Sequence, residues 1–334
     1  ETEIWYNRTR FDGDAQDAAK RAQFPLLDRI AYTGFTDVDS MSTGYRRART
    51  WGRDLEGGQW TMGHDLRFVK QELNEIASGT TLGFPVPFNN RNSPIPRSFS
   101  VNPGLFAVYA ESFCRDWTFE SGARADYVQT DIVADPEQLR NLGLDSFPAS
   151  YEEIVGTSIS QTDRVIWSLY GTLTRRHNRC LISAASLGYA QRPPNLTELY
   201  AAQPFLLLLQ NGLNNVTGDP RLKREQLIQA DWSVDFDSRY LRAGFRGFYG
   251  WAMDYITLEN TNVVRAPPNG EIQQVSLRYV NTELATLAGF ESFAEWNPRN
   301  RLTPFITVRY VDGRDRTRNG DFATTNGRPV SYTH

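Results

Sequence analysis

Hydrophobic and polar residues alternate with a period of two along many segments of the chain. The clearest segment runs from Trp117 to Tyr127. Its odd-numbered positions are aromatic or small apart from Ser121, and its even-numbered positions are Thr, Glu, Gly, Arg and Asp. Successive side chains of a β-strand point to opposite faces, so the pattern predicts a strand with one apolar and one polar face. Its aromatic ends are about eleven residues apart, the length of a tilted transmembrane strand.

The same alternation recurs from one end of the chain to the other and predicts about twelve strands. No turn signature separates 276–283 from 285–296, and the other divisions fall at clusters of turn-forming residues. The predicted strands are 1–10, 41–55, 60–73, 104–114, 117–130, 164–175, 180–190, 226–237, 239–256, 276–283, 285–296 and 301–311.

A soluble β-sandwich also alternates apolar and polar positions, so the pattern alone leaves two architectures open. The predicted strands are close to ten residues long, whereas strands of globular proteins average about five or six. The polar face of 117–130 also carries Glu120, Arg124 and Asp126, as is typical of a water-filled lumen. We therefore favour an antiparallel up-and-down transmembrane β-barrel over a sandwich.

The connections between the predicted strands alternate between short and long. Short polar turns lie at 56–59, 115–116, 176–179, 237–238 and 297–300, and long Pro-, Gly- and Asn-containing connections lie at about 11–40, 74–103, 131–163, 191–225 and 257–275. Outer-membrane barrels have short turns on one side and long loops on the other. We expect an open, curved sheet in which each strand pairs with its sequence neighbour. Five aromatic residues should lie exposed on the convex surface: Trp117, Phe119, Trp232, Phe245 and Trp251.

Composition agrees with a barrel and excludes other classes. The 36 Lys and Arg against 39 Asp and Glu give a net charge of -3, so there is no basic footprint for nucleic acid. Apolar runs such as 205–209 are far shorter than the roughly 20 residues of a membrane-spanning helix. Mean hydropathy is -0.51, which still allows a barrel because only alternate residues of its strands face lipid. The 13% of aromatic residues suits a membrane interface.

Catalytic and metal-binding patterns are absent from the sequence. There is no nucleophile elbow, phosphate-binding loop or zinc helix motif. His64 and His177 lie on separate segments without a second His or Cys at ligand spacing. Cys114 and Cys180 are too far apart for a metal cluster or a disulfide framework, and we interpret them as isolated cysteines on strands. The alternative of a carbohydrate-active β enzyme has no motif in its favour, so we predict no enzyme, cofactor or metal site.

Four ordered motifs between residues 184 and 291 resemble the barrel of TonB-dependent receptors. Residues 184–200 read AASLGYAQRPPNLTELY, similar to the family's strand end, Arg-(Ala/Pro)-Pro corner and Glu-Leu pair. Residues 218–225 read GDPRLKRE, similar to Gly-Asn-Pro-x-Leu-Lys-Pro-Glu, with Asp219 for the usual Asn and Arg224 for the usual Pro. Residues 254–256 and the span 281–291 resemble the family's Asp-x-Ile and Asn-…-Gly-x-Glu elements. The resemblance covers about 100–312.

The motif residues are interpreted as mainly structural, with direct contact to a substrate as the alternative. A Pro-Pro corner cannot donate backbone hydrogen bonds and so ends a strand. The flanking Arg192 and Glu198 are suited to fixing the loop to the wall, Gly218 and Pro220 to turning the chain, and Leu222 to anchoring it. The full set comprises Arg192, Pro193, Pro194, Glu198, Leu199, Gly218, Pro220, Leu222, Glu225, Gly289 and Glu291.

The resemblance implies an active-transport receptor in the outer membrane of a Gram-negative bacterium. Such receptors import scarce nutrients, namely iron–siderophore complexes, haem, cobalamin or other metal chelates. The TonB complex drives import by pulling on a plug domain inside a barrel of 22 strands. About twelve strands are roughly half a wall, so residues 1–334 are expected to form one partial barrel domain. No plug or TonB box is recognised, and both ends of the chain suggest truncation. A passive porin or another outer-membrane barrel is the alternative function.

Substrate contacts in this family come from extracellular loops and the plug. The resemblance therefore implies that aromatic and charged residues of the predicted loops contact the substrate here. Simple loop packing is the alternative for the same residues. An Asn-Gly-Leu-Asn-Asn segment at 211–215 is similar to a loop of copper-associated receptors, which is a minor indication. The candidates for substrate contact are Phe84, Phe88, Arg91, Phe99, Phe205 and Arg265. Expected partners are therefore outer-membrane lipid, a small nutrient or metal chelate, and the TonB complex through a plug domain.

Overall fold

A computed structural model describes most of the chain. It covers residues 1–14, 31–52, 55–81, 84–133, 143–144, 147–148, 157, 159–205, 214–263, 275–297, 303–317 and 320–321. Some of these residues are described by their backbone alone. None of the helices in the described ranges is long and apolar enough to cross a membrane.

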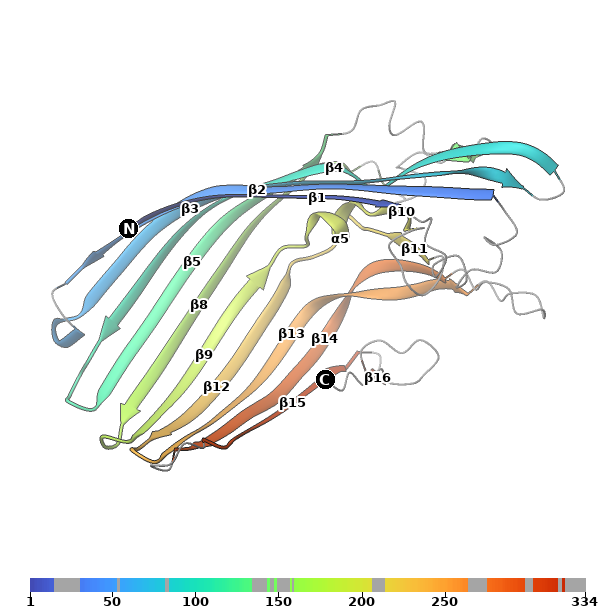
Figure 1. Ribbon diagram of the computed structural model, residues 1–334. Coiled ribbons are helices and arrows are strands. Elements are labelled where there is room, and N and C mark those ends of the chain that lie inside the picture. The colour runs from blue at the N-terminus through green and yellow to red at the C-terminus, as the bar shows by residue number, and fades with distance from the viewer. Residues whose placement is uncertain are drawn as a thin grey trace.

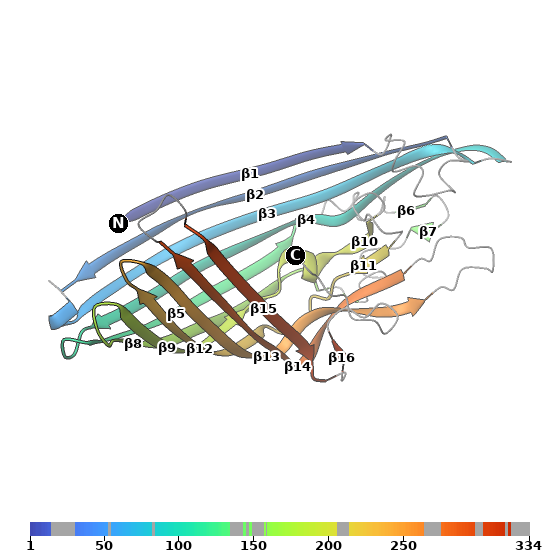
Figure 2. The ribbon, with the colours of Figure 1, turned by 60° about the horizontal axis from the view of Figure 1, so that its bottom comes forward.

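Eleven long strands form a single curved sheet, which we call the wall. Each strand pairs antiparallel with its neighbour along the chain, as predicted. Figures 1 and 2 show how the sheet bends from β1 round to β15. The strands are β1 (Thr2–Asp14), β2 (Ala31–Trp51), β3 (Gln59–Thr81), β4 (Phe84–Glu111), β5 (Trp117–Ile132), β8 (Thr162–Arg176), β9 (Leu181–Arg192), β12 (Glu225–Asp237), β13 (Leu241–Val263), β14 (Val275–Trp296) and β15 (Phe305–Asp315).

Short turns join β2–β3, β4–β5, β8–β9 and β12–β13 at one end of the wall (Figure 1). The β2–β3 turn contains a single 3₁₀ turn, η1 (Leu55–Gly57). Cys114 and Cys180 are both free and lie in the β4–β5 and β8–β9 turns, so their predicted placement on strands is wrong. Three described strands have only two residues each. β6 (Gly143–Leu144) pairs with β7 (Phe147–Pro148), and β16 (Gly320–Asp321) pairs with β15.

The predicted strands 276–283 and 285–296 are one strand, β14. Its pairing with β13 continues across the expected break, from Tyr255↔Thr282 to Met253↔Leu284. The irregularity lies on the partner strand, where Asp254 has a positive φ of 51°. Asp254 and Glu283 are skipped together and the register does not shift, so the ladder continues past them and the sequence of β14 carries no turn signature.

Much of the predicted loop 74–103 is strand. β3 runs to Thr81 and β4 begins at Phe84, so these two strands form an extended hairpin. Residues 84–96 of β4 pair with β3, whereas pairing with β5 begins at Ser98. Proline is tolerated on such an edge because its missing N–H faces no partner. β1 extends to Asp14 and β2 begins at Ala31, both within the predicted loop 11–40. β13 extends to Val263, within the predicted loop 257–275.

The outer face of the wall is rich in exposed apolar side chains. Phe119, Trp232, Phe245 and Trp251 are exposed on it, as predicted, with Trp232 exposing 48% of its surface. Trp117 lies on the same face but is half-buried, because its ring stacks on Phe113 at a centroid distance of 6.4 Å. A sheet face of this kind is typical of a surface that contacts lipid.

The inner face of the wall is polar and carries an additional folded segment. Residues 193–224, which we call the strap, contain α5 (Leu196–Tyr200), β10 (Ala202–Phe205) and β11 (Asn214–Thr217). In Figures 1 and 2 the elements α5, β10 and β11 lie inside the curve of the sheet. β10 pairs with β11, and β11 pairs in parallel with β14. The described parts of the predicted loop 191–225 are therefore folded, and β11 attaches them to β14 before the chain enters β12.

Candidate functional site

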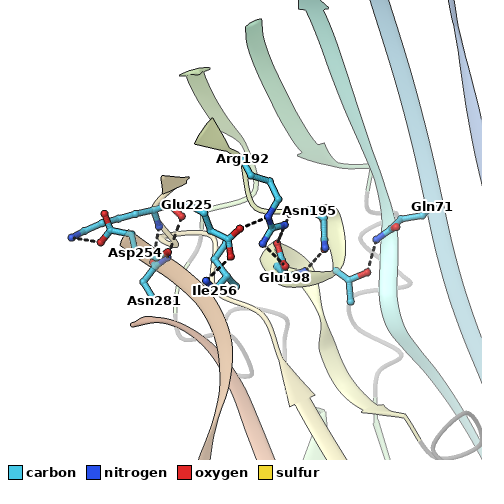
Figure 3. Close-up of polar contacts among 10 residues, drawn as sticks. Gln71, Arg192, Asn195, Glu198, Glu225, Asp254, Ile256 and Asn281 are labelled. Carbon is cyan, nitrogen blue, oxygen red and sulfur yellow. Dashed lines mark hydrogen bonds and ion pairs between the residues drawn. The ribbon is translucent and has the colours of Figure 1, made fainter. Parts of the chain in front are cut away.

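Arg192 lies between two carboxylates where the strap leaves the wall (Figure 3). Its two Nη atoms donate to the two oxygens of Glu198, each at 3.0 Å. Its Nε donates to Glu225, which stands opposite Arg192 in the β9–β12 register. Both carboxylate side chains are nearly buried, with 10% and 13% of their surface exposed. Charge-assisted bidentate pairs are among the stronger polar contacts in proteins, so this cluster ties α5 to two strands of the wall.

The local sequence explains why Glu198 reaches Arg192. β9 ends at Arg192, and Pro193 and Pro194 cannot continue the ladder. Asn195 then caps α5: its side chain accepts from the Glu198 N–H at 2.8 Å, while Glu198 accepts from the Asn195 N–H at 2.7 Å. This reciprocal capping box starts a helix and fixes the position of its N3 carboxylate.

The side chain of Asn281 on β14 attaches the return of the strap to the wall. Asn281 Oδ1 accepts from the Lys223 N–H at 2.8 Å, and its Nδ2 donates to the Lys223 carbonyl at 3.2 Å. The same amide donates to the Asp254 carbonyl at 2.6 Å. Glu225 accepts from the Ile256 N–H at 2.7 Å. Figure 3 shows that the motif residues, far apart in sequence, meet where the strap joins the wall.

The centre of the strap packs against the inner face of the wall. Leu199, Tyr200 and Ala202 are fully buried, and Val69 of β3 and Ile132 of β5 pack against their cluster. The Tyr200 hydroxyl lies 2.8 Å from the hydroxyl of Thr130. Burial raises the pKa of this phenol.

Polar contacts to β3 and β8 hold the strap from two further sides. Gln71 donates to the Thr197 hydroxyl at 3.1 Å, on the same side of the sheet as Val69. Arg164 of β8 donates to the carbonyl oxygens of Pro220 at 3.1 Å and Leu222 at 2.8 Å. These carbonyls belong to residues 218–224, the part of the strap between β11 and β12, which we call the return limb. Without a donor, the burial of these carbonyls would lower the stability of the fold.

Gly218 and Asp219 fix the return limb. A Cβ atom on Gly218 would lie 2.6 Å from the Leu199 carbonyl carbon, so only glycine allows this approach to α5. Asp219 accepts from the Arg221 side chain at 2.9 Å and from Arg278 of β14 at 3.0 Å. Burial alone would raise the pKa of Asp219, but the hydrogen bonds from Arg221 and the charge of Arg278 together lower it.

The predicted motif residues do not all meet. Arg192, Glu198 and Glu225 form the cluster, and the buried Leu199, Pro220 and Leu222 lie in the strap. Gly289 and Glu291 lie elsewhere on β14. A Cβ atom on Gly289 would meet the ring of Phe248, and Glu291 forms an exposed ion pair with Arg309 at 3.0 Å.

The predicted substrate-contact residues are only partly described. Phe84, Phe88 and Arg91 lie in β4 and Phe205 in β10, but their side chains are outside the described set, and Arg265 is outside the described residues. Phe99 stacks on Phe68 at 6.1 Å. Phe68 alternates with Val69, so this pair lies on the outer face and Phe99 points away from the strap.

Several residues of the site were not found from the sequence, among them Asn195, Arg164 and Arg278. Asn195 stands three residues before Glu198, a spacing that indicates a capping box. Arg164 and Arg278 donate to strap residues from strands remote in sequence, and no local pattern marks either. The site holds ion pairs and packed side chains. Across the described ranges, no three His, Cys, Asp or Glu residues are arranged to hold a metal ion.

Comparison with known proteins identifies the family. The sequence matches the family described as "TonB dependent receptor-like, beta-barrel" over residues 2–333. The chain belongs to the TonB-dependent receptor β-barrel family. This family resides in the outer membrane of Gram-negative bacteria and is non-enzymatic. No curated protein sequence matches the chain.

Among solved structures, the comparison finds receptors and transporters at low sequence identity, and the copper transporter OprC shares the fold. The copper transporter OprC aligns with a TM-score of 0.66 and 15% identity, over 96% of this chain and 44% of its own. The Serratia marcescens haemophore receptor HasR, solved as a double mutant with HasA and haem, aligns with a TM-score of 0.46, 15% identity and coverages of 94% and 49%. The Pseudomonas aeruginosa siderophore receptor PirA aligns with a TM-score of 0.41 and 12% identity, over 94% of this chain and 64% of its own. The chain thus spans about half the length of the first two structures.

Proposed function

We propose that this chain forms part of the wall of a TonB-coupled receptor that imports a scarce nutrient across the outer membrane. The family match over residues 2–333 carries the proposal. The strap supports it, because a folded segment on the inner face narrows the lumen. A narrowed lumen suits selective uptake of a bound ligand better than free diffusion through a passive porin.

The wall as described is open, which bears on the domain organisation. β1 pairs with β2, and β15 pairs with β14 and the two-residue β16. Unpaired sheet edges inside a membrane are costly because lipid offers no hydrogen-bonding groups. The proposed receptor therefore pairs these edges with further strands, and a plug domain inside the closed barrel makes the contact with the TonB complex. In this arrangement residues 1–334 form one partial barrel domain.

The proposed nutrient is a metal chelate, such as an iron–siderophore complex, haem or cobalamin, or a copper species. The transporter of copper and the receptors of haemophore and siderophore found by structural comparison support this class. The role proposed for Arg192, Glu198 and Glu225 is to position the strap and not to contact the ligand, because their polar groups already bind one another and both carboxylates are nearly buried. Ligand contact is proposed for the remaining candidates, Phe84, Phe88, Arg91, Phe205 and Arg265, and not for Phe99, whose ring lies on the outer face.

Growth of a deletion strain tests the proposal. The strain is grown with iron–siderophore, haem, cobalamin or copper as the limiting source, and is complemented with the gene in backgrounds with and without TonB. A receptor restores growth on one source only when TonB is present. A porin restores uptake of several small solutes regardless of TonB, and that result would overturn the proposal. Complementation with Arg192→Gln should lower uptake on the same source, and substitution of Arg309, in an exposed wall pair, should not.

A further inference from the structure

Three arginines lie over aromatic rings at the short-turn end of the wall, and we call these pairs the arginine girdle. Arg49 lies over Trp51, Arg175 over Trp117 and Arg239 over Tyr240, with distances of 5.4, 5.0 and 5.4 Å from the guanidinium carbon to the ring centre. A guanidinium within about 6 Å of a ring face is held there by cation–π attraction. The arginines are therefore oriented groups rather than freely moving charges.

Two pairs of the girdle belong to the outer face, and the third lies in a turn at the same end of the wall. Trp117 and Arg175 are opposite each other in the β5–β8 register and share the face of the exposed Phe119. Trp51 stands opposite Trp60 in the β2–β3 register, and both rings are exposed. Tyr240 lies in the β12–β13 turn. The pairs thus recur from β2 to the β12–β13 turn at the level where the outer face meets the short turns.

The girdle arginines differ from the arginines of the inner face in their partners. On the inner face, Arg124 lies between Asp65 at 2.6 Å and Asp126 at 2.5 Å, and Arg192 also lies between two carboxylates. None of the ion pairs in the described part of the chain includes a girdle arginine. Glu111, a carboxylate at this end, accepts instead from the Tyr109 hydroxyl at 2.7 Å. Among the described residues, the girdle therefore presents positive charge with no carboxylate in an ion pair with it.

We propose that the arginine girdle binds the phosphate groups of anionic phospholipids in the membrane leaflet that adjoins the short turns. Arginine presents a planar fork of donors that matches two phosphate oxygens. Tryptophan and tyrosine prefer the level of the lipid headgroups, so the rings place the guanidinium groups at the depth of the phosphates. Basic side chains at a membrane surface favour anionic over neutral lipid. The girdle would thereby set the vertical position of the wall in the bilayer.

Lipid binding by the purified protein tests this proposal. Detergent-solubilised protein is titrated with phosphatidylglycerol or with phosphatidylcholine of the same acyl chains, and bound lipids are counted by native mass spectrometry. The wild type should prefer phosphatidylglycerol by about fivefold for each girdle arginine. The triple variant R49Q/R175Q/R239Q should bind both lipids equally. Equal binding by the wild type, or an unchanged preference in the variant, would overturn the proposal.

A matched control removes the same kind of pair from the inner face. Arg46 lies over Phe106 at 4.3 Å, and Arg242 lies over Phe293 at 5.8 Å. R46Q/R242Q should keep the wild-type preference, and an equal loss in this variant would show that the girdle has no special role. If the glutamine triple variant does not fold, R49K/R175K/R239K replaces it. Lysine keeps the charge but lacks the fork, so the preference should fall, and an unchanged preference contradicts the proposed geometry.

Discussion

The wall and the strap are built from the same chain but are stabilised in different ways. On the wall, large apolar side chains are exposed on the outer face, as in Leu187, which has 60% of its surface accessible. In the strap, Leu199 is completely buried. The wall depends on backbone pairing and on lipid around it, whereas the strap depends on packed side chains and ion pairs, as a water-soluble domain does. Substitutions in the strap should therefore affect the stability of the strap alone, whereas substitutions on the outer face should affect the stability of the wall in lipid.

Loss of side-chain volume from the strap should have the largest effect. Leu199→Ala removes a fully buried side chain, which typically costs about 2–5 kcal/mol. The strap should loosen while the wall stays folded, so amide hydrogen exchange should rise in α5 and β11 but not in β12 and β13. A matched change on the wall, Leu187→Ala, leaves no cavity because the side chain is exposed. Faster exchange throughout the wall in Leu199→Ala would contradict independence of the two regions.

A charge on the outer face should destabilise the wall, and lipid determines how much. Leu187→Arg places a cation against hydrocarbon and should cost about 2–4 kcal/mol near the bilayer centre. The measurement is urea-induced unfolding in phospholipid vesicles. Gln229→Arg introduces the same charge on the inner face beside Asp231, a hydrogen-bond partner of Gln229, and should cost less than about 1 kcal/mol. Similar costs for both variants would show that the outer face does not contact lipid.

Removal of the Arg192 charge should release the strap at its attachment point. Arg192→Gln leaves Glu198 and Glu225 nearly buried without their cation. Leaving charged groups unpaired should cost about 2–3 kcal/mol, since the partial exposure of Arg192 reduces the penalty of a fully buried pair. Limited proteolysis should show earlier cleavage within 193–224. Arg309→Gln breaks an exposed wall pair and should change the cleavage pattern little.

The cap of α5 should contribute less. Asn195→Ala removes the acceptor of the Glu198 N–H and should cost about 1 kcal/mol. Asn195→Asp keeps the acceptor and should retain most of the stability. Hydrogen exchange of α5 separates the two variants. An equal effect of both would show that the capping box does not stabilise the strap.

Acid should weaken the attachment of the return limb to β14, and this is the smallest of the expected effects. The pKa of Asp219 is lowered in the folded protein, mainly by hydrogen bonds from Arg221 and the charge of Arg278, which together outweigh its burial. Its contribution is therefore complete above its ordinary pKa of 3.8 and is lost as the pH falls through the lower folded value. Thermal unfolding from pH 7 to pH 3 should show a steeper loss for the wild type than for Asp219→Asn. Parallel curves would exclude Asp219 as the source.

Periodicity was sufficient to predict the wall. Each long strand lies where alternation predicted it, because every second residue must face lipid or water. The prolines in 74–103 led to the wrong prediction of a loop. The early part of β4 pairs with β3 alone, so it is a sheet edge, where proline is tolerated. The expected break before 285 failed because the irregularity lies on β13.

The strap was beyond reach of the same reasoning. α5 has five residues and β11 four, too few for a period to emerge. The resemblance marked Arg192, Glu198 and Glu225, and their physical roles suggested contact between strap and wall. The positions of Arg164 and Arg278 depend on pairing between distant strands, which no local pattern records.

The parallel pairing of β11 with β14 also sets an order of events during folding. β11 ends at Thr217 and its partner begins at Val275, so about sixty residues must be synthesised and placed before this ladder can form. The contacts of α5 with β3 and β5 involve strands that precede it and need no such delay. Non-local contacts form late because closing a long loop costs entropy. The strap is thus expected to close in two steps, with its second step completing only after β14 has joined the sheet.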